Sequence, residues 1–198
     1  MPFSTVPLVA CSPALFFAAG AAPSELFQDD DGTVYLLWGG GRIARMKPDM
    51  SGVVPEDAEN WHGLPSLIDR PDGTRPLDDV GGWLTKMKGR YVLLFNRWGG
   101  TRNMKLEQPA GGRYYGTYDY EACHSKELFG PYSRPHVAVP HGGHGNVFQD
   151  KQGRWWATMF CNDGTAPWPQ GTVLHLPLEV EEREGMLHID VADHLPAD

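Results

Sequence analysis

One hairpin pattern occurs three times along the chain. In each copy an apolar strand end leads through a polar turn closed by glycine into an aromatic strand; the copies are Phe27–Trp38, Leu84–Phe95 and Phe148–Phe160. This arrangement is typical of a tight β-hairpin. The turn glycines, Gly32, Gly89 and Gly153, stand about 57 and then about 64 residues apart. Hairpins repeated at this spacing, with no heptads and no long amphipathic run, indicate β-propeller blades of about four strands each.

The length limits how many blades the chain can hold. At about 60 residues per blade, 198 residues make about three blades, whereas propellers close with four to eight. We therefore predict an all-β fold, a partial β-propeller of about three four-stranded blades in a single domain over 1–198, with 1–23 as a remnant of an earlier blade or as edge strands. An open fan exposes sheet edges and an apolar wall, so we expect a homo-oligomer that closes it, or a missing blade.

Composition agrees with many short strands and excludes two classes of partner. Hydrophobic residues make up 41% of the chain, and 24 glycines and 17 prolines supply turns. The net charge of -8 and the lack of Lys/Arg clusters argue against nucleic acid. No segment has the roughly 18 to 20 apolar residues of a membrane span. Prolines interrupt the apolar stretch 1–22 and no Lys or Arg precedes it, which argues against a signal peptide, and the compartment stays open.

The pattern along the chain predicts individual strands. They are Leu8–Cys11, Ala14–Phe17, Glu25–Phe27, Val34–Trp38, Arg42–Met46, Trp83–Met87, Tyr91–Phe95, Tyr114–Glu121, His136–Pro140, Asn146–Gln149, Trp155–Phe160 and Thr172–Leu176. The only helical turn is expected around Pro55–Trp61. Long loops, Ser51–Asp79 and Gly99–Arg113, are expected to build a pocket on one face of the propeller. The three cysteines cannot all pair, and we expect them to be small core residues without structural zinc.

Several segments, in their order and spacing, resemble a known family. The segments are Leu26–Gly39, Arg42–Gly52, Gly82–Lys86, Gly130–Tyr132 and Gly142–Phe148 followed by Trp155 and Trp156. They resemble the middle blades of glycoside hydrolase family 43, five-bladed propellers that cut arabinose- and xylose-containing glycans. The resemblance spans most of residues 24–190 and implies a glycosidase acting on a polysaccharide or oligosaccharide.

The resemblance implies three carboxylates that this sequence lacks at the matching positions. The family uses a base Asp on its first blade, which has no counterpart here, an Asp in an Asp-Pro step, and an acid Glu in a Glu-Gly step. These two steps fall on Ala22-Pro23, or on Ser12-Pro13, and on Val80-Gly81. Inverting hydrolysis needs an acid and a base on opposite faces of the bond. Asp79 and Glu25 are the nearest carboxyl groups and are our candidate catalytic residues.

Four further residues are candidates for the sugar site. The resemblance places His144 near the propeller axis, where the family's histidine helps to hold a central cation such as Ca²⁺; a histidine hydrogen-bonded without metal is the alternative. Trp83 and Trp98 flank the pocket loops and could stack on sugar rings. Arg97 could bind sugar hydroxyl groups. No cofactor is required beyond that optional cation.

Two other functions stay open. The first is a carbohydrate-binding propeller that kept the blades and lost the carboxylates. The second is a sialidase-like propeller, because the sequence of Gln149–Trp155 is close to that of the Asp-box motif. No arginine triad of the sialidase type can be assigned. The sequence does not decide the sugar, the linkage or whether the chain is catalytic, because a fold does not by itself determine function.

Overall fold

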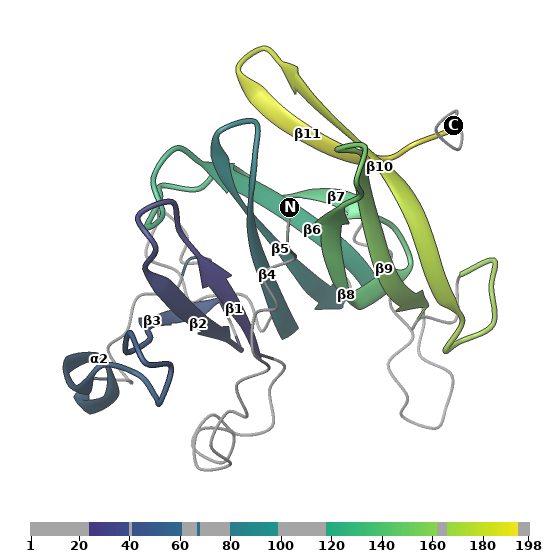
Figure 1. The fold of residues 1–198 in the computed structure, drawn as a ribbon. Helices are drawn as coiled ribbons and strands as arrows, with labels where there is room; N and C mark the ends of the chain where they lie inside the picture. The colour runs from purple at the N-terminus through teal and green to yellow at the C-terminus, as the bar shows by residue number, and fades with distance from the viewer. Residues whose placement is uncertain are drawn as a thin grey trace.

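The computed structural model describes residues 24–39, 41–60, 67, 80–98, 118–161 and 166–193, and it contains three antiparallel sheets arranged as a fan (Figure 1). Blade A comprises β1 (Ser24–Gln28), β2 (Val34–Trp38) and β3 (Arg42–Arg45). Blade B comprises β4 (Val80–Met87), β5 (Arg90–Trp98), β6 (Tyr118–Ser125) and β7 (His136–Val139). Blade C comprises β8 (Gly142–Gln149), β9 (Trp155–Cys161), β10 (Val173–Arg183) and β11 (Met186–Val191).

The repeated glycines are the turn residues of the hairpins, as the sequence predicts. Gly32, Gly89 and Gly153 have φ of 87°, 72° and 78°, a region that glycine adopts without a steric penalty. The third turn is also fixed by Asp150, whose carboxylate accepts hydrogen bonds from the Arg154 backbone N–H and from Trp156 Nε1. These bonds, together with the Arg154 guanidinium, outweigh the effect of burial and lower the pKa of Asp150.

Blade B lies between blades A and C, and both of its faces are apolar. Side chains alternate along β5, so that Leu93 and Phe95 pack on blade A while Val92 and Leu94 pack on blade C. All four side chains are fully buried. Each pair of neighbouring blades therefore encloses its own core, which is how radial sheets around a common axis are stabilised.

Polar contacts add to the packing between blades A and B. Lys86 Nζ on β4 lies 2.6 Å from Asp29 Oδ1 and 2.5 Å from Asp30 Oδ2, both in the β1–β2 turn. Tyr91 donates a 2.8 Å hydrogen bond to Asp29 Oδ2. Hydrogen bonds from Lys86 and Tyr91 outweigh the effect of burial and lower the pKa of Asp29.

We expect Asp29→Asn to weaken the contact between blades A and B. The change removes the charge that pairs with Lys86, and we expect it to lower the free energy of unfolding by about 1 kcal/mol at neutral pH. Because the folded pKa of Asp29 is depressed, the wild type should lose this contribution as pH falls below the unfolded value of about 3.9. Urea denaturation of the variant and of Asp31→Asn, a more exposed carboxylate in the same turn, measures the difference; equal losses would contradict the role of Asp29.

The structure confirms the fold class and most of the expected strands. The predicted helical turn is α2 (Pro55–Glu59). Several strands extend past their predicted bounds, chiefly β5 to Trp98, β6 to Ser125 and β10 to Arg183, while β8 begins earlier, at Gly142. The strand β11 was not predicted, although its residues alternate apolar and polar. The expected strands Leu8–Cys11 and Ala14–Phe17, together with residues 1–23 and the loop Gly99–Arg113, lie outside the described residues. Within the described part of the chain, no helix is long and apolar enough to cross a membrane.

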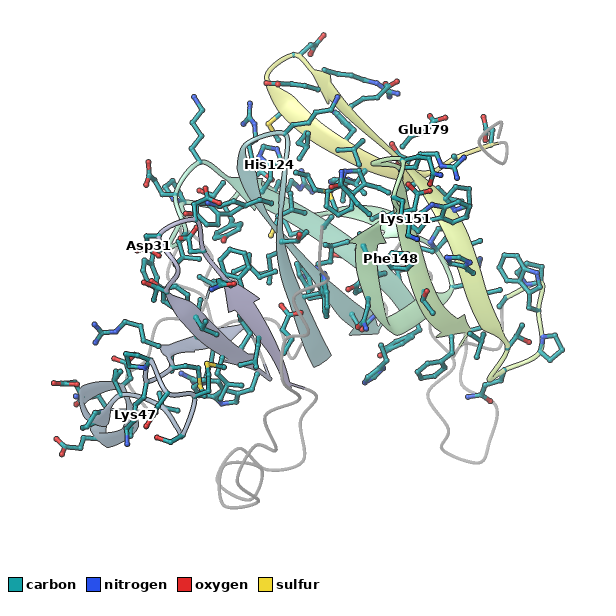
Figure 2. All side chains as sticks on the ribbon, in the orientation of Figure 1. Asp31, Lys47, His124, Phe148, Lys151 and Glu179 are labelled. Atoms are coloured by element: carbon teal, nitrogen blue, oxygen red, sulfur yellow. The ribbon has the colours of Figure 1, made fainter. Side chains whose placement is uncertain are left out.

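The outer face of blade C carries exposed apolar side chains around His175. His175 stacks on Phe148 with ring centroids 5.7 Å apart and lies 4.7 Å from Trp156. Val173 is 72% exposed and Phe148, which Figure 2 labels on β8, is 40% exposed. Cys123 and Cys161, on the inner faces, are buried and pack in the two cores.

Candidate functional site

Polar side chains from all three blades meet where the innermost strands approach one another. Each blade begins with one such strand, and β4 contacts both β1 and β8 (Figure 1). We call the residues that connect the blades here the axial cluster; they are Glu25, Asn96, Tyr118, Tyr120 and His144. The cluster is built from strands far apart in the sequence, so only the packing of the blades brings it together.

Glu25 is the buried carboxyl group of the axial cluster. Its side chain on β1 is 9% exposed and accepts a hydrogen bond from the Leu84 backbone N–H on β4. Its other oxygen, Oε2, has no hydrogen-bond partner among the described residues. Burial raises the pKa of Glu25 to about 9, so the group carries a proton at neutral pH. A carboxylic acid kept neutral in this way can donate a proton, as a general acid must.

His144 is held in a fixed orientation on β8. Its backbone has φ of 47°, and its N–H donates a 2.8 Å hydrogen bond to Asn96 Oδ1. Its Nδ1 lies 2.5 Å from the Tyr118 hydroxyl oxygen, and its ring stacks between Tyr118 and Phe160 at 5.8 and 5.6 Å. Burial lowers the pKa of His144 and raises that of Tyr118, so both groups are neutral near pH 7. The residue as a whole is exposed, so a ligand can reach it.

The two glycines that flank His144 allow its strand to pack closely enough to place the ring here. A Cβ atom on Gly143 would lie 2.1 Å from Asn96 Nδ2, and one on Gly145 would lie 2.1 Å from the Thr158 carbonyl oxygen. Tyr120 donates a 3.1 Å hydrogen bond to the Gly145 carbonyl. The glycines therefore let β8 approach blade B and β9 more closely than any other residue would allow.

The resemblance implies a central cation near His144, and the described residues supply no cluster of charged ligands for it. Across the ranges that the structure describes, no group of three His, Cys, Asp or Glu side chains could hold a metal ion. His144 Nδ1 is also engaged by Tyr118. The arrangement fits the hydrogen-bonded alternative better, and the central cation stays a prediction.

Two further buried carboxylates lie on β6 and were not identified from the sequence. Glu121 is fully buried and forms a 3.2 Å ion pair with Arg97. Asp119 is also fully buried and accepts a 3.0 Å hydrogen bond from the His141 backbone N–H. The sequence of β6 contained an indication of them, because its acidic residues stand among aromatic and small apolar residues that are typical of a buried strand. Acidic groups in such a strand are buried only when they have partners.

The other predicted residues have different surroundings. Trp83 on β4 is half-buried against the core between blades B and C, and its Nε1 has no partner in the described part of the chain. Arg97 lies on β5 and not on a loop. Trp98 is the last residue of β5. Asp79 directly precedes β4 and lies outside the described residues.

A groove of about 650 Å³ lies between blades B and C, separate from the axial cluster. Its lining includes Lys86, Lys88, Arg154, Trp155 and Glu179, from the β4–β5 hairpin and from blade C. Lys86 and Arg154 are paired with carboxylates outside the groove, in Asp29, Asp30 and Asp150. None of the lining residues belongs to the axial cluster.

Comparison with solved structures identifies the architecture. An exo-1,5-α-L-arabinanase from a bovine ruminal metagenomic library aligns over 84% of this chain with a TM-score of 0.60 and 13% sequence identity. This chain has a GH43-like fold. A bifunctional GH43-CE protein of Bacteroides eggerthii aligns over 88% of this GH43-like chain with a TM-score of 0.53 and 26% identity. An α-L-arabinanase of Cellvibrio cellulosa, solved in complex with arabinohexaose, aligns over 83% with a TM-score of 0.55 and 15% identity.

The GH43-like chain covers only part of each of these structures. It spans 55% of both arabinanases and 20% of the bifunctional protein. The sequence matches no protein-family model and no curated protein. The three blades described above therefore align with part of each of these structures.

Proposed function

We propose that this GH43-like chain acts in the hydrolysis of arabinose- or xylose-containing glycans. The observation that carries the proposal is a protonated, buried carboxyl group, Glu25, in the axial cluster of a fold shared with arabinanases and xylanases. Cleavage of a glycosidic bond requires a proton donor at the leaving oxygen, and a carboxyl group with a raised pKa supplies it. Glu25 is our proton donor, and Asp79, next to β4, is our second catalytic carboxyl group.

His144 has a separate role in this proposal. Its ring is locked between two aromatic rings and is neutral, so it can hydrogen-bond a sugar hydroxyl without carrying charge. Trp83, Trp98 and Arg97 remain proposed substrate contacts. Trp83 has a buried indole N–H that is unpartnered within the described ranges and is a hydrogen-bond donor of the kind that a sugar oxygen accepts.

Carbohydrate binding without hydrolysis is the second candidate. Two of the buried carboxylates, both on β6, are already engaged, Glu121 by Arg97 and Asp119 by the His141 N–H. A carboxylate used in this way stabilises the blade and is poorly placed to activate water. A chain with these commitments can bind a glycan through aromatic rings and hydroxyl contacts alone.

Hydrolysis assays distinguish the two candidates. We expect sugar release from arabinan or xylan, or p-nitrophenol release from the matching arabinofuranoside or xyloside. Glu25→Gln should lower kcat at least about 10²-fold because it removes the proton. Glu127→Gln, at an exposed turn after β6, should leave kcat unchanged. Oligosaccharide binding by calorimetry with no turnover on any substrate would reject hydrolysis and favour the binding function.

We expect His144→Ala to weaken oligosaccharide binding in either case. The variant loses the imidazole contact, and we expect the Kd to rise about tenfold, equivalent to one lost hydrogen bond of about 1.4 kcal/mol. His141→Ala, at the turn before β8 and outside the axial cluster, is the control, because the variant keeps the backbone N–H that donates to Asp119. Calorimetric titration with arabino- and xylo-oligosaccharides measures both; an unchanged Kd in His144→Ala would remove His144 from the site.

A further inference from the structure

Histidines line the contact between blade B and the last hairpin of blade C. In Figure 1 the β10–β11 hairpin rises over blade B, and β11 lies against β7. The Leu187 backbone N–H on β11 donates a 2.9 Å hydrogen bond to Nε2 of His124 on β6. The Ile189 N–H, two residues on, lies 3.1 Å from Nε2 of His136 on β7. Figure 2 labels His124, which lies beside the hairpin.

The bond from Leu187 requires a neutral His124. A ring nitrogen that accepts an N–H bond carries no proton, so protonating Nε2 breaks the bond. The neutral ring therefore carries its proton on Nδ1, which is buried and has no partner among the described residues. Protonating Nε2 as well creates an imidazolium whose charge is buried without an acceptor among these residues. His136 is less constrained, because the Ile189 carbonyl oxygen lies 3.2 Å from its Nε2 and can accept a hydrogen bond when that nitrogen is protonated.

The groups around His124 make a positive charge there still less favourable. Arg90 on β5, His136 on β7 and His188 on β11 face it and disfavour its protonation, whereas Glu182 on β10 favours it. Arg90 and Glu182 also form a 2.5 Å ion pair, so the positive charge of Arg90 offsets the favourable effect of Glu182 on the protonation of His124. His136 is faced by Asp190 and Glu121, which favour its protonation, and by His188, which opposes it.

We infer that His124 is a pH-sensitive latch: at neutral pH it holds the β10–β11 hairpin against blade B, and acidification releases the hairpin. The bond to Leu187 and the burial of Leu187 and Ile189 between the hairpin and blade B are lost together, because both residues lie on β11. The latch is independent of any glycan and depends only on the contact between the two blades.

The direction of the pH effect follows from the lowered pKa values. Burial lowers the pKa of His124 and of His136 below the unfolded value of 6.5. The stabilisation is therefore complete above about pH 6.5 and decreases as pH falls below it, until the folded histidines are themselves protonated. Each unit by which the folded pKa is lowered corresponds to about a tenfold change in the equilibrium.

Amide hydrogen exchange tests the latch on the folded chain. We expect the protection factors of the Leu187 and Ile189 amides, corrected for intrinsic exchange, to fall on the order of tenfold between pH 7.5 and pH 5.5. The amides of Leu93 and Leu94 on β5, in the middle layer, should change much less. Equal changes in β5 and β11 would mean global destabilisation and would overturn the latch, as would unchanged protection in β11.

A substitution separates His124 from other titrating groups. His124→Gln keeps an oxygen acceptor for the Leu187 N–H and cannot titrate, so most of the pH dependence in β11 should disappear. His175→Gln, on the outer face of blade C, should keep the wild-type pH dependence. Full pH dependence in His124→Gln would overturn the proposal; if this variant does not fold, the comparison of β5 with β11 in the wild type still decides.

Discussion

Gly145→Ala is expected to destabilise the fold by more than about 3 kcal/mol, because the new methyl group has no space. Its Cβ would lie 2.1 Å from the Thr158 carbonyl oxygen and 2.9 Å from the Met159 Cα. Both are backbone atoms of β9, so no side-chain rotation relieves the contact. The strand must shift instead, and the hydrogen bond from Tyr120 to the Gly145 carbonyl is lost with it. Thermal and urea unfolding measure the loss.

Gly82→Ala is the matched control for this prediction. Gly82 also lies in an innermost strand, but a Cβ atom there would meet only Leu93 Cδ1 at 3.6 Å, an ordinary contact. We expect this variant to be within about 0.5 kcal/mol of the wild type. Similar stability in the two variants would show that β8 and β9 can separate at no cost, and the close approach that positions His144 would then have no structural role.

Glu25→Gln is expected to make the protein more stable at alkaline pH while it abolishes hydrolysis. The folded pKa of about 9 lies above the unfolded value of 4.5, so the folded protein retains a proton that the unfolded chain releases. The wild type should therefore lose stability as pH rises from about 4.5 to about 9. Glutamine is a neutral isostere whose carbonyl oxygen can still accept the Leu84 N–H. We expect a gain of about 1 to 3 kcal/mol at pH 8.5.

Urea denaturation at pH 5 and pH 8.5 measures this effect. The stability of Glu25→Gln should depend less on pH than that of the wild type, whereas Glu127→Gln, at an exposed position, should follow the wild type. A variant that is less stable than the wild type at pH 8.5 would show that Glu25 is ionised in the fold. Greater stability together with lost turnover is the combination expected of a residue retained for catalysis at the expense of stability.

The local structure of this chain follows closely from its sequence. The hairpins at Gly32, Gly89 and Gly153 were predictable because a polar turn closed by glycine between two strands usually forms a tight β-hairpin. The strand β11 (Met186–Val191) was missed although the turn before it, Glu184-Gly185, is a polar turn closed by glycine with φ of 52° and 76°, because no aromatic strand follows it as in the repeated pattern. Its apolar side chains Leu187 and Ile189 are buried only because blade B lies beside them.

The candidate site was predictable only in part. Glu25 and His144 were identified as candidates, but the buried pair Arg97–Glu121 was not, because a pair formed across two strands depends on their register. The raised pKa of Glu25 likewise depends on its burial between blades, which no local pattern records. The histidine contacts of β11 were missed for the same reason, since His124 and Leu187 are 63 residues apart.

The sequence by itself therefore determined the hairpins, the repeat and hence the kind of sheet, because turn chemistry and side-chain alternation act over a few residues. The tertiary structure alone decided which charges are buried, which are paired and which carry a proton. Those properties depend on the surroundings that distant strands provide, and blades A, B and C create these surroundings only when they pack together around the axis.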